Sequence, residues 1–215
     1  MKKWVFTSVL VLSMGIAFSQ PKYKNLVLEG GGVRGFAYVG ALEMLDSIGI
    51  LQQLERVGGT SAGAIQAMLI ALGYTPAEIR QVIADMPLKE FNDGSITGGP
   101  GRLKRKFGFF KGHKLMSWVE RLIAAKTGDA DISFMELYRQ KQEKNYKDLY
   151  ITGTDLTYRC LRIFSYESYP DMKIKDALRI SFAIPLYFEP VMIDERGTVH
   201  TGKSTDGLHL MVDGG

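Results

Sequence analysis

The sequence predicts an α/β fold in which a central sheet, rich in parallel strands, is sandwiched by helices. Two segments carry this prediction. Residues 22–29, with the apolar run Leu26 to Leu28, predict a strand that runs into glycines and then into an apolar helical pattern, and residues 54–57 begin the same succession again. Alternation of strand, loop and helix is typical of a parallel sheet, and it places the two glycine-rich loops at the same edge of that sheet.

The first strand is expected to be buried, because Leu26, Val27 and Leu28 form a continuous apolar run. The helix after it, residues 36–48, ends at Gly49, a residue that suits a helix C-terminus. Beyond these elements, the pattern predicts helices at residues 62–71, 76–86, 115–126 and 174–182, and strands at residues 149–156, 160–165 and 208–213.

The strongest chemical signal lies where the second strand turns into its helix. Residues Gly59, Thr60, Ser61, Ala62 and Gly63 match the pattern G-x-S-x-G. A sharp strand-to-helix turn strains its corner residue, and glycines on both sides remove the β-carbons that would clash there. The corner serine would stand at a helix N-terminus, where free N–H groups favour negative charge. The pattern favours Ser61 as a nucleophile; the alternative is a small-residue helix start in which Ser61 is a cap.

The glycine-rich loop after the first strand has two interpretations. It consists of Gly30, Gly31, Gly32, Val33, Arg34 and Gly35. It fits the dinucleotide fingerprint G-x-G-x-x-G. Dinucleotide-binding folds, however, require an acidic residue at the end of the second strand to bind the ribose, and here glycines and Ser61 follow that strand instead. The other interpretation is an oxyanion hole, in which one donor is typically worth about 2.7–4 kcal/mol. Arg34 would add a fixed positive charge or form a structural salt bridge.

The N-terminus predicts export. Residues 1–19 combine Lys2 and Lys3 with an uncharged apolar run and the small residues Ala17 and Ser19, which is typical of a cleaved signal peptide. The alternative is a single membrane anchor, for which the run is short. We therefore expect a signal peptide at 1–19 and one domain at 20–215, with a periplasmic, outer-membrane-associated or secreted location. Cleavage would lower the formal net charge from +4 to +2, too mild to indicate nucleic acid.

Residues 102–114 form a basic segment, from Arg102 to Lys114. It holds six cationic residues and four large apolar ones, without an acid. Basic charge interleaved with phenylalanine suits the boundary of an anionic bilayer, so membrane contact is one interpretation. The alternative is a solvated basic loop whose phenylalanines pack inward.

Other residue types give weaker signals. The three histidines lie far apart in the sequence, so no metal site and no cofactor are expected. The single cysteine, Cys160, cannot form an internal disulfide. Asp155 ends a predicted strand and is a catalytic acid or a turn residue. Asp213, followed by Gly214 and Gly215, is an exposed acid at a tight bend or an ordinary Asp-Gly turn.

Taken in order, these blocks resemble the signatures of the patatin-like phospholipase family. The resemblance rests on residues 30–35, residues 59–63 and Asp213 with its two glycines, together with a small-residue and proline block at residues 181–185. It covers nearly all of residues 20–215. One departure is that the chain stops directly after the aspartate motif, so the domain is C-terminally truncated on this interpretation.

The resemblance implies a three-layer α/β fold and a serine–aspartate dyad that uses no histidine. Carried over, Ser61 is the nucleophile, Asp213 the base, and Gly31 and Gly32 with neighbouring loop amides the oxyanion hole. The implied substrate is a membrane or micellar lipid, cleaved at a carboxylic ester through an acyl-enzyme. The sequence does not indicate the headgroup, the acyl position or the oligomeric state.

Two alternatives to a dyad lipid hydrolase stay open from the residues alone. The first is a serine esterase with a histidine base, built from Ser61, Asp155 and either His200 or His209 in the chain order of α/β-hydrolases. The second is a non-catalytic module that binds lipid or a dinucleotide.

Overall fold

The computed structural model of the protein describes residues 23–94, 99–202 and 206–215. The predicted signal peptide at residues 1–19 lies outside these ranges. Within them, no helix combines the length and the apolar character needed to cross a membrane.

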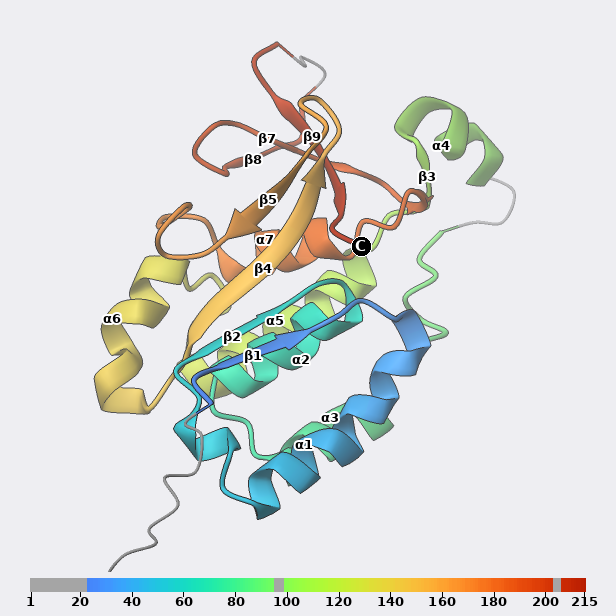
Figure 1. The fold of residues 1–215 in the computed structure, drawn as a ribbon. Coiled ribbons are helices and arrows are strands. Elements are labelled where there is room, and N and C mark those ends of the chain that lie inside the picture. Colours follow the sequence, from blue (N-terminus) through green and yellow to red (C-terminus); the bar gives the residue numbers. More distant parts are fainter. Residues whose placement is uncertain (1–22, 95–98, 203–205) are drawn as a thin grey trace, which may run out of the picture.

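The structure is built on one mixed sheet of seven strands (Figure 1). Strands β1 (Asn25–Leu28), β2 (Arg56–Gly59) and β4 (Asp148–Asp155) pair in parallel. The antiparallel strands are β5 (Cys160–Phe164), β7 (Val191–Ile193), β8 (Val199–His200) and β9 (His209–Asp213). The order is β1-β2-β4-β9-β7-β8, with β5 paired to β4. A small second sheet pairs β3 (Gly108–Phe110) with β6 (Leu186–Phe188) in parallel.

The helices expected within residues 36–48, 62–71, 76–86, 115–126 and 174–182 are present, and one of them lies at the centre of the core. A helix also forms at residues 134–144. Another forms at residues 99–106, so the first part of the basic segment is helical and the interpretation of that segment as a loop was wrong there. The α-helices are α1 (Tyr38–Ser47), α2 (Ala62–Ala71), α3 (Pro76–Ala84), α4 (Gly99–Lys106), α5 (His113–Thr127), α6 (Phe134–Lys144) and α7 (Ile174–Ser181), with short 3₁₀ turns η1 (Gly32–Ala37) and η2 (Leu51–Gln53). Nine of the ten residues of α2 are buried. A helix that is apolar all round is expected only inside a protein, so α2 is the central helix of the fold.

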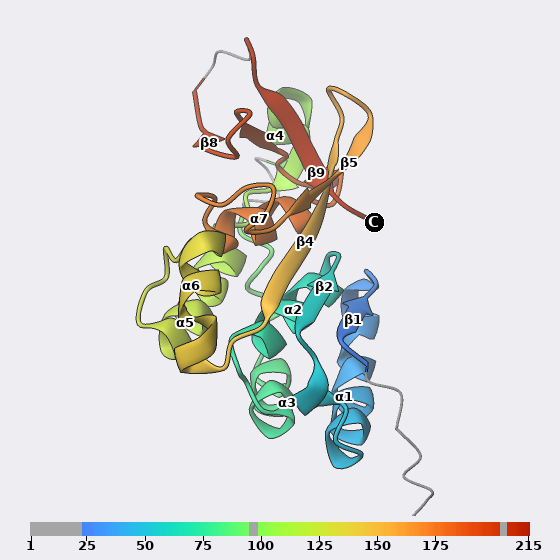
Figure 2. The same ribbon diagram turned by 60° about the vertical axis from the view of Figure 1, so that its left-hand side comes forward.

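The predicted α/β class with a central sheet is confirmed, and the structure refines the arrangement of its layers. Parallel crossovers are right-handed, and the strands β1, β2 and β4 advance in one direction, so their connecting helices pack on one face. Figure 1 shows α2 and α7 behind β2 and β4, and Figure 2 shows the same layers from another side. The prediction of a wholly buried first strand was wrong. Val27 is 79% exposed because its side chain lies on the opposite face of an edge strand, and only Leu28 is buried.

One feature of the sheet places two distant parts of the chain together. Ile151 of β4 pairs with Gly59 on one edge and with Phe164 on the other. Two residues further, Gly153 pairs with Arg162 of β5 and with Asp213 of β9. Strands β2 and β9 therefore share one edge of β4 and run toward each other, so that their C-terminal ends meet beside Thr152.

Candidate active site

Ser61 stands at the corner between β2 and α2. Its backbone has φ 50° and ψ −123°, a left-handed conformation that is rare for residues other than glycine. A β-carbon on Gly59 would lie 2.3 Å from the carbonyl oxygen of Gly63, and one on Gly63 would lie 2.2 Å from that of Leu28. Both contacts are far too close for real atoms, so the strained corner requires both glycines. This geometry is the sharp strand-to-helix turn predicted from the G-x-S-x-G pattern.

The glycine loop lies against this corner. A β-carbon on Gly30 would lie 3.3 Å from the Cβ of Ser61, and one on Gly35 would lie 2.9 Å from the Cβ of Ala62. The loop then tightens into the turn η1, with φ +53° at Gly32. The side chain of Arg34 is exposed and lies over Gly31, and it forms no salt bridge with any residue that the structure describes. The backbone of the loop thus reaches the serine without side chains in between.

Asp213 comes from the other side of the same meeting point, at the end of β9. Its carboxylate accepts a hydrogen bond from the amide of Gly215 at 3.1 Å, and its side chain is 8% exposed. Burial raises the pKa of Asp213, although the hydroxyl of Ser61 and the amides of Gly215 and Gly214 counteract part of the rise as hydrogen-bond donors. The structure therefore brings together Ser61 and Asp213, two of the predicted site residues. The carboxyl group of Asp213 is the one whose pKa is raised.

The block at residues 181–185 holds both of these residues. The amide of Ser61 donates to the Oγ of Ser181 at 2.8 Å, and the amide of Asp213 donates to the carbonyl oxygen of Ala183 at 3.0 Å. Ser181 is fully buried at the end of α7. From the sequence, this block was identified only by its resemblance to a family motif. Its role as a clamp was missed, because no local pattern shows which distant amide a buried serine will meet.

A second link ties the two turns to the middle strand. The hydroxyls of Thr60 and Thr152 form a hydrogen bond beside the serine. A β-carbon on Gly214 would lie 2.5 Å from the Oγ1 of Thr152, so the aspartate motif passes this threonine without room for a side chain. Gly214 is thereby required by close packing, and Thr152 was not predicted as part of the site.

An apolar cavity of about 230 Å³ opens beside the serine turn. It begins at the glycine loop, with Gly32 and Gly35, and at Ala62, the residue after Ser61. Its walls are mainly apolar side chains from distant segments, among them Ile65, Ile83, Met86, Phe91, Leu115, Phe182 and Phe188. Gln66 is one of the few polar lining residues, and its buried amide oxygen lacks a hydrogen-bond partner in the part of the chain that the structure describes. A cavity of this character suits a hydrocarbon chain.

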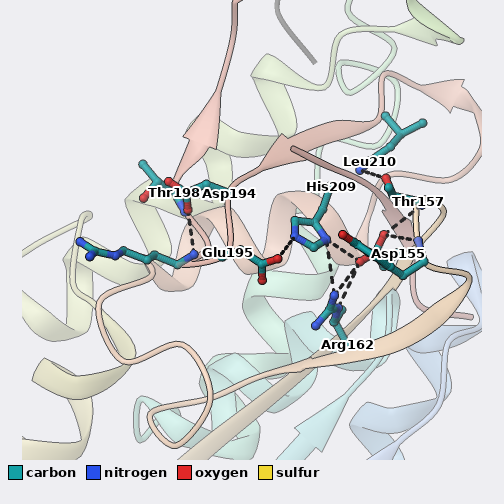
Figure 3. Close-up of polar contacts among 10 residues, drawn as sticks. Asp155, Thr157, Arg162, Asp194, Glu195, Thr198, His209 and Leu210 are labelled. Atoms are coloured by element: carbon teal, nitrogen blue, oxygen red, sulfur yellow. Dashed lines mark hydrogen bonds and ion pairs between the residues drawn. The ribbon is translucent and has the colours of Figure 1, made fainter. Parts of the chain in front are cut away.

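The residues of the alternative triad do pair with each other, but not with Ser61. The Nδ1 of His209 lies 2.7 Å from the Oδ2 of Asp155, which also accepts two hydrogen bonds from Arg162, at 3.0 and 3.1 Å (Figure 3). The other ring nitrogen of His209 lies 3.1 Å from Glu195. His209 starts β9 whereas Asp213 ends it, and four residues of strand span about 13 Å.

His200 is also placed away from the serine. It lies on β8, at the far edge of the sheet, where its Nε2 is 3.2 Å from Asp194. The register of the sheet therefore separates both histidines from Ser61. Among the described residues, no group of three histidine, cysteine or acidic side chains is arranged to hold a metal ion.

Known proteins match most of this chain in sequence. Protein R571 of Acanthamoeba polyphaga mimivirus is 34% identical over 177 residues, which cover 82% of this chain and 57% of that protein. A probable lipid hydrolase, 463L of Invertebrate iridescent virus 6, is 32% identical over 174 residues, covering 80% and 57%. The chain thus spans somewhat more than half the length of these relatives.

Solved structures show the same fold. The crystal structure of VipD from Legionella pneumophila superposes with a TM-score of 0.65 at 20% identity, covering 91% of this chain and 46% of VipD. The profile of a family described as patatin-like phospholipase matches residues 26–215, from β1 to the last glycine of the aspartate motif. The chain belongs to the patatin-like phospholipase family.

Proposed function

We propose that the chain is a serine-dependent lipid acyl hydrolase that cleaves carboxylic esters of phospholipids or related lipids with Ser61 and Asp213. The observation that carries the proposal is the meeting of β2 and β9 on one edge of β4, which sets the serine turn beside the buried aspartate. The apolar cavity that begins at Ala62 supports a substrate with a hydrocarbon chain.

Each step of the proposed reaction uses Ser61, Asp213 and one water molecule. The carboxylate of Asp213 accepts the proton of the Ser61 hydroxyl as the Oγ attacks the ester carbonyl. Collapse of the tetrahedral intermediate breaks the bond to the alcohol portion of the lipid, which leaves with the proton from Asp213. A water molecule then attacks the acyl-enzyme and gives a proton to Asp213. Collapse of this second tetrahedral intermediate releases the fatty acid, and Asp213 returns the proton to the Oγ of Ser61.

The oxyanion of the tetrahedral intermediate is assigned to backbone amides around the serine turn. The amide of Ala62 belongs to the first turn of α2, where N–H groups lack partners within the helix. The amides of Gly31 and Gly32 lie in the glycine loop that packs on Ser61. Loss of one such donor typically costs about 2.7–4 kcal/mol of transition-state stabilisation.

The raised pKa of Asp213 supports its role as the base. An ordinary aspartate is a weak base near neutral pH, and burial strengthens it by destabilising the charged form. Asp155 is different: burial would raise its pKa, but hydrogen bonds from His209, from the amide of Tyr158 and from Arg162 outweigh burial and lower it. Of Asp155 and Asp213, only Asp213 has the raised pKa that suits a base.

The test is covalent labelling with a fluorophosphonate, followed by product analysis on mixed lipids by mass spectrometry. We expect the chain to be labelled at Ser61 and to release fatty acid from an ester lipid. Ser61→Ala should abolish both signals, Asp213→Asn should reduce both strongly, and Ser47→Ala, an exposed serine on α1, should change neither. Full labelling of folded Ser61→Ala would refute the nucleophile. Unchanged hydrolysis by Asp213→Asn would refute the base.

Export belongs to the same proposal. A signal peptide at residues 1–19 would place the enzyme in the periplasm, at the outer membrane or outside the cell. Mass spectrometry of the secreted or periplasmic chain should give Gln20 as its N-terminus, and an intact Met1 on the located protein would contradict cleavage.

A further inference from the structure

Two large apolar side chains stand out into solvent at one end of the small sheet. Phe107 is 61% exposed and directly precedes β3, and Leu186 is 62% exposed and begins β6. Gly108 and Leu186 are paired residues of the two strands, so Phe107 and Leu186 are neighbours at the same end of the ribbon. We call these two residues the apolar tip.

The backbone at the apolar tip is strained at both positions. Phe107 has φ 55° and Leu186 has φ 67°, in the left-handed region that glycine and asparagine tolerate far better than bulky residues. Local strain of this kind concentrates at functional sites. An exposed phenylalanine and an exposed leucine thus occupy positions where neither the backbone nor the solvent favours them.

The neighbouring helix carries the positive charge. Lys104, Arg105 and Lys106 form the last turn of α4 and are exposed. None of the three has an acidic partner among the residues that the structure describes. Figure 1 shows α4 and β3 together on the outside of the molecule, away from α1, α3 and α6. The apolar tip therefore follows directly after a cluster of unpaired cations.

The rest of the basic segment anchors this region to the domain. Arg102 is mostly buried, and its side chain lies 3.2 Å from Glu189 and donates to the carbonyl oxygen of Phe109 at 2.8 Å. Phe110 packs on Tyr187 with ring centroids 4.9 Å apart. The segment is thus divided: Phe109 and Phe110 are partly buried, whereas Phe107 and the three cations face solvent.

The apolar tip continues into the rim of the cavity beside Ser61. Tyr187, which follows Leu186, lines the cavity and is 41% exposed, and Ile184 lines it and is 39% exposed. Val33, Phe36 and Leu88 are further cavity residues with large exposed areas. A contiguous apolar surface of this kind marks an interaction site. Here it consists of exposed side chains that also line the cavity that a lipid chain would occupy.

We propose that the apolar tip, Phe107 and Leu186, inserts into an anionic lipid bilayer while Lys104, Arg105 and Lys106 bind its headgroups. The charge of the cluster selects an anionic surface, and the apolar tip supplies the buried area. The inference deepens the proposed function, since docking in this orientation sets the cavity entrance at the lipid surface.

The test is flotation of the chain with vesicles, measured in a Ser61→Ala background so that binding is read without hydrolysis. Vesicles are phosphatidylcholine alone, or phosphatidylcholine mixed with phosphatidylglycerol. We expect binding to the anionic vesicles only, weakened by added salt. Phe107→Asn with Leu186→Asn should weaken it at least tenfold, roughly the effect of exposing one large apolar side chain. Asparagine tolerates positive φ, so the midpoint of thermal unfolding should be unchanged or higher.

The matched control removes exposed apolar area elsewhere. Leu161→Thr with Ile163→Thr on β5, where the side chains are 57% and 48% exposed, should leave vesicle binding unchanged. For charge, Lys104→Gln with Lys106→Gln should weaken binding about 30-fold, on the basis of one cation being worth roughly 1 kcal/mol at an anionic surface. Arg139→Gln with Lys144→Gln, two exposed cations on α6, should have little effect.

Equal binding by the apolar-tip variant and its parent, or equal binding to both kinds of vesicle, would overturn the docking surface. The result is separable from the proposed function. If the protein with its natural Ser61 binds anionic vesicles but hydrolyses no ester, the docking surface is retained and the hydrolase is refuted. Hydrolysis of a water-soluble short-chain ester, with no vesicle binding, would retain the hydrolase and refute the docking surface.

Discussion

The amide of Ser61 donates a 2.8 Å hydrogen bond to the hydroxyl of Ser181, which lies 120 residues further along the chain. Two residues on, the carbonyl of Ala183 accepts from the amide of Asp213. One short segment, from the last residue of α7 to Ala183, therefore fixes the backbone of both residues of the proposed dyad. Their relative position depends on this segment as much as on the strands that deliver them.

Ser181→Ala should lower both stability and turnover. The substitution leaves the buried N–H of Ser61 without a partner, which typically costs about 1–3 kcal/mol. Because the cavity is untouched, kcat should fall more than KM rises. Urea unfolding and steady-state kinetics on an ester substrate measure the two effects. Ser117→Ala, at an exposed serine of α5, is the control; equal behaviour of the two variants would show that the link to Ser61 is unimportant.

Gly59→Ala and Gly63→Ala should prevent stable folding of the serine turn. Each new β-carbon would meet backbone atoms at 2.2–2.4 Å, and neither neighbour is a flexible side chain that can move away. The yield of soluble protein and its thermal midpoint measure the effect. Gly40→Ala on α1 is the matched control, since nothing lies within 4 Å of its β-carbon, and it should gain about 0.5–1 kcal/mol in helix stability. A folded, active Gly63→Ala chain would contradict the strained-corner interpretation.

Asp213→Asn should remove activity and raise stability at neutral pH. Burial raises the pKa of Asp213 above its ordinary value of 3.8, so the folded chain holds this proton to a higher pH than the unfolded chain does. The free energy of unfolding contributed by this group is therefore greatest at low pH and falls as pH rises from 3.8 through the raised pKa. Asparagine does not ionise, so it avoids the free-energy cost of burying a charged carboxylate at neutral pH.

The same shift sets the acid limb of the activity. The base must be ionised to accept the Ser61 proton, so kcat/KM should fall with decreasing pH through the raised pKa rather than near 3.8. Thermal unfolding of both chains across the acid range, with a pH–rate profile of the natural chain, tests both statements. A variant that is less stable than its parent at neutral pH would contradict the burial argument.

The sequence was sufficient for the parts of the site that depend on local geometry. Glycines on both sides of Ser61 and after Asp213 are required by contacts of less than 3 Å, and such requirements leave a pattern that can be read without a structure. The clamp from Ser181 and the cavity walls left no pattern, because each depends on which distant segments the fold brings together. The exposed face of β1 was missed for a related reason: an apolar run does not tell which face of a strand is covered.

The histidines illustrate the limit most clearly. Asp155 and His209 stand in the chain order of a triad and do form a 2.7 Å contact, so the pairing anticipated from sequence exists. The register of β9, with Asp213 opposite Gly153 and Met211 opposite Asp155, decides which of its residues reaches Ser61. A strand register is set by the whole sheet and is not recorded in the spacing of the triad residues.

His209→Ala should therefore reduce stability while leaving the chemistry intact. Removing the imidazole takes a hydrogen bond from the buried carboxylate of Asp155, and bonds to charged groups are worth about 1.5–3 kcal/mol. Arg162 still pairs with that carboxylate, so the fold should survive. Urea unfolding should show the loss, whereas kcat per labelled active site, titrated with a fluorophosphonate, should stay within a few-fold of the parent. His200→Ala, at the far edge of the sheet, should change neither quantity. A folded His209→Ala chain whose rate of labelling and turnover both drop by orders of magnitude, as expected for loss of the base, would restore the histidine-dependent esterase.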